Sequence, residues 1–143
     1  MATIPKTLQP HINSAFPQHV CLVGSVLPDG YAQITPRGSV QVYDDQHISI
    51  WERGRGTTTA SIGDGTNVTV FYFNLGARDV LPIGGIVRLY GTASVHKSGP
   101  VYDKVWERLI EPEKKSDPEK KGWAVLIRVD RVEDLFGQTL SEN

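Results

Sequence analysis

Trp51 ends an apolar stretch and is followed by a short segment rich in groups that can bind an anion. Besides its glycines, this segment holds two arginines, Arg53 and Arg55, and a run of three threonines that begins with Thr57 and Thr58. Glycine lets the backbone approach a ligand closely, and arginine carries a permanent charge on a planar set of donors. Threonine hydroxyls and the free N–H groups at the start of a helix donate in the same direction. The segment therefore fits a phosphate-binding loop, with a short helix beginning near Thr57.

The same residues also fit a simpler structure, which is a glycine-rich connection with solvated arginines and a threonine cap. The sequence has no P-loop and no dinucleotide-binding fingerprint, so the motif alone does not decide between the two.

A second candidate segment contains Thr35, Pro36, Arg37 and Gly38, at the end of a strand-like stretch. Proline has no N–H to give to a β-ladder and should lie at an edge or a break, and the glycine beside it suggests a bulge. Backbone groups freed in this way can hydrogen-bond the polar edge of a planar ring. An ordinary bulge at a barrel corner is the alternative that these residues leave open.

Other catalytic patterns are missing from the sequence. The four histidines, His11, His19, His47 and His96, do not have the spacing of metal ligands, and there is no Gly-x-Ser-x-Gly motif. Cys21 lies in an apolar stretch, where a buried and inert thiol is expected. As the only cysteine, it also excludes an intramolecular disulfide. No metal site is predicted.

Alternating apolar residues predict six or seven β-strands joined by short turns. Strands are expected over 20–27, 31–35, 67–73, 86–95 and 123–129, with a hairpin over 40–50. One long amphipathic helix is expected from Pro100 to Pro112, and a short one over 6–15. The fold class is therefore mainly β, an antiparallel, Greek-key-like barrel whose closure removes exposed strand edges.

The composition fits one globular domain over residues 1–143, with 39% hydrophobic and 22% charged residues. A net charge of −1 argues against a nucleic-acid partner. No apolar run approaches the roughly 20 residues of a membrane helix, and no signal-peptide pattern is visible. We therefore expect a soluble, cytoplasmic protein. The segment 111–122 mixes opposite charges with prolines, which predicts a solvated surface loop that ligand binding can spare.

The order of motifs along the chain resembles the FMN-binding split-barrel superfamily. This superfamily includes pyridoxamine 5'-phosphate oxidases, small bacterial FMN-binding proteins and flavin-dependent reductases. The resemblance extends over about residues 8–136 and depends on the whole pattern: Pro28-Asp29-Gly30, Ile34-Thr35-Pro36, Asp44-Asp45, the Arg/Gly/Thr segment, the strands 86–93 and 124–129, and Ser98-Gly99-Pro100 before the helix.

The resemblance implies that FMN lies between the two subunits of a homodimer. It places the phosphate after the strand that ends at Trp51, on Arg53, Arg55, Thr57 and Thr58. Family members usually have a lysine near the two threonines. This chain has none there, so the segment either relies on Arg53 or Arg55 for its charge or binds FMN more weakly.

By the same resemblance, Thr35, Pro36, Arg37 and Gly38 wrap around the isoalloxazine ring. The C-terminal part does not match the vitamin-binding pattern of the oxidase, which disfavours that particular activity.

The function expected from these features is that of an FMN-dependent oxidoreductase, with NAD(P)H or another compound as electron donor. Two alternatives stay open. One is an FMN-binding electron carrier without a substrate of its own, and the other is a split barrel that no longer binds flavin and serves as a structural or haem-related binder.

Overall fold

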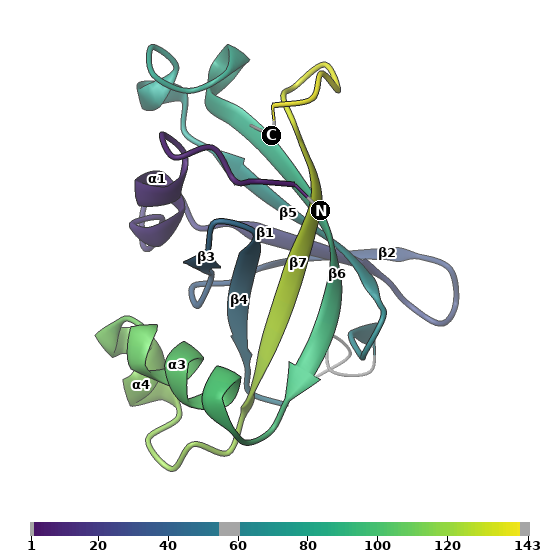
Figure 1. Cartoon of the computed structure of the whole chain (residues 1–143), viewed down its shortest axis with the longest axis vertical. Coiled ribbons are helices and arrows are strands. Elements are labelled where there is room, and N and C mark those ends of the chain that lie inside the picture. The colour runs from purple at the N-terminus through teal and green to yellow at the C-terminus, as the bar shows by residue number, and fades with distance from the viewer. Residues whose placement is uncertain (1, 55–60, 141–143) are drawn as a thin grey trace.

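Seven antiparallel strands form one sheet in the computed structural model, which describes residues 2–54 and 61–140 (Figure 1). The expected mainly β, antiparallel architecture is confirmed. Along the sheet the strand order is β2-β1-β5-β6-β7-β4-β3. The strands are β1 (Leu22–Val26), β2 (Ala32–Pro36), β3 (Gln41–Asp44), β4 (His47–Glu52), β5 (Asn67–Phe73), β6 (Ile86–His96) and β7 (Trp123–Glu133).

The connection between β2 and β3 forces the sheet to curl. These two strands are the edges of the sheet, yet only residues 37–40 join them. The crossing is fixed by two hydrogen bonds, one from the Arg37 N–H to the Cys21 carbonyl (2.9 Å) and one from the Trp51 N–H to the Ser39 hydroxyl (3.0 Å). Pro36 is the last residue of the edge strand β2, as predicted, where a missing N–H is tolerated.

Strict alternation in β5 and β6 separates an inner from an outer face of the sheet. Val68, Val70 and Tyr72 of β5 are at most 2% exposed and belong to the core. Phe71 and Phe73 point the other way, as the sequence pattern predicts, and Phe73 is 47% exposed. The short helix α1 (Gln9–Asn13) adds the buried Ile12 to the core and is shorter than the expected 6–15.

The helix α3 (Pro100–Arg108) covers β4 and β7 and makes a second, smaller apolar cluster (Figure 1). Its first residue is proline, as expected for a position whose N–H needs no partner. The helix ends at Arg108, before the predicted end at Pro112, because Leu109 takes an extended backbone conformation. Two short 3-10 helices, Leu75–Ala77 and Ile83–Gly85, connect β5 to β6.

The prediction of a solvated loop over 111–122 is wrong. This segment contains the helix α4 (Glu111–Ser116), and both Glu113 and Asp117 are buried. Pro112 lies in the first turn of the helix instead of breaking it. The mixed charge of the segment predicts exposure, but two of its acidic residues are buried. Among the described residues, no helix has the length and hydropathy that a membrane crossing requires.

Candidate functional site

The two segments predicted to bind ligand meet where β2 and β4 end. Together they border a cavity of about 210 Å³, which we call the rim cavity. The structure thus brings six of the predicted site residues together, whereas Arg55, Thr57 and Thr58 lie outside the described residues. The rim cavity is lined by Thr35, Pro36, Arg37, Gly38, Ser39, Trp51, Glu52, Arg53 and Glu113.

The Arg37 guanidinium forms an ion pair within the fold. Its Nη2 atom donates to Oε2 of Glu52 at 2.9 Å and to the Trp51 carbonyl at 3.2 Å. The two charged side chains are only 13% and 4% exposed, so little water screens them. The other Glu52 oxygen accepts the Gly54 N–H at 3.1 Å. This pair therefore holds the β2–β3 crossing against the end of β4.

Trp51 holds the end of β4 in place, but its ring is buried and offers no surface to a ligand. Its side chain is 1% exposed and packs against Tyr102 and Trp106, each with a ring centroid 5.1 Å away. The indole N–H donates to Oδ2 of Asp117 at 2.9 Å. These contacts with α3 and with Asp117, the residue after α4, therefore fix the end of β4 from which Arg53 extends.

Asp117 is the polar anchor of this region. It also accepts the backbone N–H groups of Lys121 (2.9 Å) and Gly122 (2.8 Å). Burial alone would raise the pKa of this carboxyl group, but the hydrogen bonds from Trp51 and the two backbone amides, with the positive charge of Arg53, hold the pKa below its usual value. Arg53 itself is exposed.

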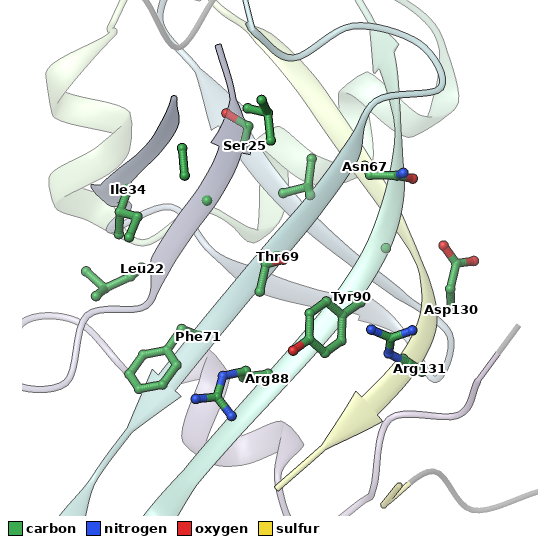
Figure 2. A pocket seen from close by; sticks show the side chains of 15 residues that line it. Leu22, Ser25, Ile34, Asn67, Thr69, Phe71, Arg88, Tyr90, Asp130 and Arg131 are labelled. Atoms are coloured by element: carbon green, nitrogen blue, oxygen red, sulfur yellow. The ribbon is translucent and has the colours of Figure 1, made fainter. Parts of the chain in front are cut away.

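A larger cavity of about 780 Å³ lies on the outer face of the sheet, and we call it the sheet-face pocket (Figure 2). Sequence analysis missed it, although the alternation in β5 and β6 already separates its residues from the core. The lining comes from five strands: Leu22, Gly24, Ser25 and Val26 of β1, Ala32 and Ile34 of β2, Asn67, Val68, Thr69 and Phe71 of β5, Arg88, Tyr90 and Gly91 of β6, and Asp130 and Arg131 of β7.

Aromatic rings and arginines alternate along this pocket, as Figure 2 shows. The Arg131 guanidinium lies 4.3 Å from the Tyr90 ring centroid, and that of Arg88 lies 5.9 Å from the Phe71 centroid. Arg88 also donates to the carbonyls of Asp134 (3.3 Å) and Leu135 (3.2 Å). A concave site of this size, mostly apolar with few polar groups, is typical of one for a planar organic ligand.

The first described residue after the predicted phosphate-binding loop lies at the edge of the sheet-face pocket. The hydroxyl of Ser61, the first described residue after it, lies 2.8 Å from that of Ser25. Ser25 lines the pocket. Ser61 therefore lies beside a residue of the sheet-face pocket.

Cys21 is buried, as predicted, and burial raises the pKa of its thiol to about 12. Such a thiol is not a nucleophile near neutral pH. Within residues 2–54 and 61–140, no three His, Cys, Asp or Glu side chains are grouped so that they could hold a metal ion.

Comparison with known proteins places this geometry in context. The sequence profile of a family described as pyridoxamine 5'-phosphate oxidase matches residues 2–135. No curated protein matches the chain.

Several solved structures share the fold. HupZ from Group A Streptococcus has a TM-score of 0.67 and 21% identity, over 98% of this chain and 99% of that one. An FMN-binding protein from Syntrophomonas wolfei has a TM-score of 0.70 and 16% identity, over 91% and 84%. General Stress Protein 26 from Bacillus anthracis has a TM-score of 0.58 and 13% identity, over 94% and 98%.

Proposed function

The chain belongs to the pyridoxamine 5'-phosphate oxidase-like family of split barrels, and on that basis we propose that it binds FMN and acts as an FMN-dependent oxidoreductase. Residues 1–143 would form a single domain of this type. The observation that carries the proposal is the sheet-face pocket, whose 780 Å³ falls within the ~300–1,000 Å³ usual for cofactor sites. The rim cavity, at 210 Å³, is below that range. The related fold of an FMN-binding protein adds support.

Each part of FMN has a counterpart among these residues. Phe71 and Tyr90 offer flat apolar surface to a ring system, and Thr69 and Asn67 offer hydrogen bonds to its polar edge. We assign the phosphate to the loop that contains Arg53, Arg55, Thr57 and Thr58.

The candidate segment of Thr35, Pro36, Arg37 and Gly38 would lie at the border of the bound ring. Pro36 pairs with Leu22, which lines the pocket, so this strand end adjoins it. Arg37 and Trp51, being committed to internal contacts, would hold the backbone of this border in place.

A second copy of the chain would complete the site. The sheet face is unusually apolar for a surface, since Val26 is 63% and Ile34 is 67% exposed. Tyr31 and Phe136 are exposed to 75% and 71%. A partner related by a two-fold axis would cover this face and enclose two equivalent cofactors. The proposal therefore includes a homodimer.

Bound flavin supplies hydride and electron transfer, and the protein supplies orientation and exclusion of water. The described lining includes one acidic side chain, Asp130, which is held by the Thr92 hydroxyl (2.7 Å) and by Arg128 (3.0 Å). A site without a free acid also suits the second candidate function, an electron carrier that has no substrate of its own.

Titration of the apoprotein with FMN and with riboflavin tests the proposal. We expect FMN to bind at least about 100-fold more tightly, because a phosphate gains several charge-assisted hydrogen bonds. Absence of flavin binding would refute the proposed function. Anaerobic bleaching of the bound flavin by NAD(P)H would identify an enzyme that uses this donor, and bleaching only by a chemical reductant would favour the carrier.

A further inference from the structure

Arg88 of β6 lines the sheet-face pocket with a guanidinium group whose donors are only partly used. Its Nη1 atom donates to the carbonyls of Asp134 and Leu135, at 3.3 and 3.2 Å. Among the described residues, its Nε and Nη2 atoms have no hydrogen-bond partner. These two atoms form one edge of the planar group, which matches the two oxygens of a carboxylate. The two carbonyls thus hold Arg88 in place and leave a donor edge available.

Two further donors lie beside Arg88 on the outer face of the sheet. Tyr90 is two residues along β6, and its hydroxyl has no hydrogen-bond partner within the described part of the chain. Arg131 is paired with Tyr90 across β6 and β7, and its guanidinium lies 4.3 Å from the Tyr90 ring centroid. Figure 2 shows the Tyr90 ring between the two arginines. We call these three residues the donor cluster.

The charges on the pocket wall leave Arg88 without an acidic partner. The charged residues that line the pocket are Arg88, Arg131 and Asp130, two positive and one negative. Arg131 donates to Glu133 at 3.1 Å, and Asp130 accepts from Arg128 at 3.0 Å, so each of these two has a partner of opposite charge. Within residues 2–54 and 61–140, Arg88 forms no ion pair. An anion that enters the pocket would compensate this charge.

The surface next to the donor cluster fits an aromatic ring. Phe71 is paired with Arg88 across β5 and β6, and the guanidinium carbon lies 5.9 Å from its ring centroid. Leu22 is paired with Phe71 on the other side, and both line the pocket. A ring packed on Phe71 and Leu22 would therefore carry a charged substituent to Arg88.

We propose that the donor cluster binds the carboxylate of a small aromatic substrate, with Arg88 as its principal partner. A monoanion matches the one positive charge that has no acidic partner, whereas a phosphate dianion would need a second. The word substrate rests on the proposed oxidoreductase function, but binding to the donor cluster does not. The cluster also lies apart from the proposed phosphate-binding loop. That loop is followed by Ser61, which contacts Ser25 of β1, and β5 lies between β1 and β6.

The experiment uses benzoate as the probe, with benzamide as its uncharged counterpart and phenyl phosphate as the dianion. Binding is measured by NMR of the 15N-labelled full chain, both without flavin and with FMN. Benzoate should give saturable shifts in both forms and bind at least about tenfold more tightly than benzamide, the value of one charge-assisted hydrogen bond. Phenyl phosphate should bind no more tightly than benzoate.

The two proposals fail in different ways. A chain that binds benzoate but no flavin would support the donor cluster and refute the proposed function. A chain that binds flavin but not benzoate would overturn the donor cluster alone. Equal affinity for benzoate and benzamide, tighter binding of phenyl phosphate, or displacement of FMN by benzoate would also overturn it.

Arg88→Gln removes the charge and should weaken benzoate binding by at least about tenfold, with the preference for FMN over riboflavin retained. Tyr90→Phe keeps the ring and removes the hydroxyl, so a loss of about threefold is expected. Arg78→Gln is the matched control, because Arg78 also donates to a backbone carbonyl, at 3.2 Å, but does not line the pocket.

Unchanged benzoate affinity in Arg88→Gln would overturn the proposal. So would loss of its preference for FMN, because the cluster would then hold the phosphate of the cofactor. The comparison of benzoate with benzamide on the unmodified chain decides the matter even if Arg88→Gln does not fold.

Discussion

The rim cavity and the sheet-face pocket lie on the same sheet but differ in almost every physical respect. The rim cavity is small and is lined by four charged residues, of which Arg37 and Glu52 form an ion pair. The sheet-face pocket is nearly four times larger and is lined mainly by aliphatic and aromatic side chains, with Arg88, Asp130 and Arg131 among them. The difference suggests that the rim holds the strand ends in place, whereas the sheet face is the surface that the proposed cofactor and second copy would cover.

The largest expected effect is on the proposed homodimer. Ile34→Asp places a charge on the apolar sheet face, and burying it unpaired in an interface would be prohibitive. We expect the dimer dissociation constant to rise by at least about 100-fold, with loss of flavin affinity and an unchanged fold. Analytical ultracentrifugation measures this. Val80→Asp, at a residue 65% exposed outside the pocket, is the control. A variant that stays fully dimeric would show that the copies meet elsewhere.

Next in size is the loss of the anchor at Asp117. Replacing it with alanine leaves the Trp51 indole and two backbone N–H groups unpaired, so the free energy of unfolding should fall by about 2–4 kcal/mol. Urea denaturation measures this, with Asp103→Ala on exposed α3 as the control. A loss below about 1 kcal/mol would show that Asp117 does not anchor this region.

The same anchor predicts a pH dependence. Because the pKa of Asp117 is lower in the folded state, its contribution is present above the unfolded pKa and is lost as the pH falls through the folded pKa. The stability difference between the unmodified chain and Asp117→Ala should therefore be constant near neutral pH and shrink below about pH 4. A difference that grows on acidification would contradict this.

A smaller effect is expected from the arginines of the proposed phosphate-binding loop. Arg55→Ala should lower FMN affinity by about tenfold or more and leave riboflavin affinity unchanged. Arg53→Ala should have the smaller effect, because the charge of Arg53 already interacts with Asp117. Titration with both flavins separates the two. If both variants keep the full preference for FMN, the phosphate is held by other residues.

Much of the barrel is predictable from local pattern. The alternation of Val68, Val70 and Tyr72 fixes the buried face of β5, and Asp44-Asp45 marks the turn of the β3–β4 hairpin. The site is less predictable. Its glycines, prolines and arginines indicate which residues border the rim cavity, but not which side chains pair with one another. That Arg37 is neutralised by Glu52 depends on how the sheet closes.

Two features of the structure could not be predicted from sequence patterns, for physical reasons. The sheet-face pocket depends on the register that places Tyr90 beside Thr69 and Arg131, from three different strands. The inward turn of Glu113 and Asp117 reverses the usual rule that charged segments are solvated. Both follow from tertiary contacts that no local window contains.

The central claim is that FMN binds on the sheet face and not in the rim cavity. The direct test is the FMN dissociation constant of two variants, Tyr90→Ala in the pocket and Glu113→Gln in the cavity, followed by quenching of flavin fluorescence. We predict that Tyr90→Ala weakens FMN binding by about tenfold, through loss of ring contact, and that Glu113→Gln leaves it unchanged. Unchanged affinity in Tyr90→Ala with a loss in Glu113→Gln would place the cofactor at the rim and contradict this account.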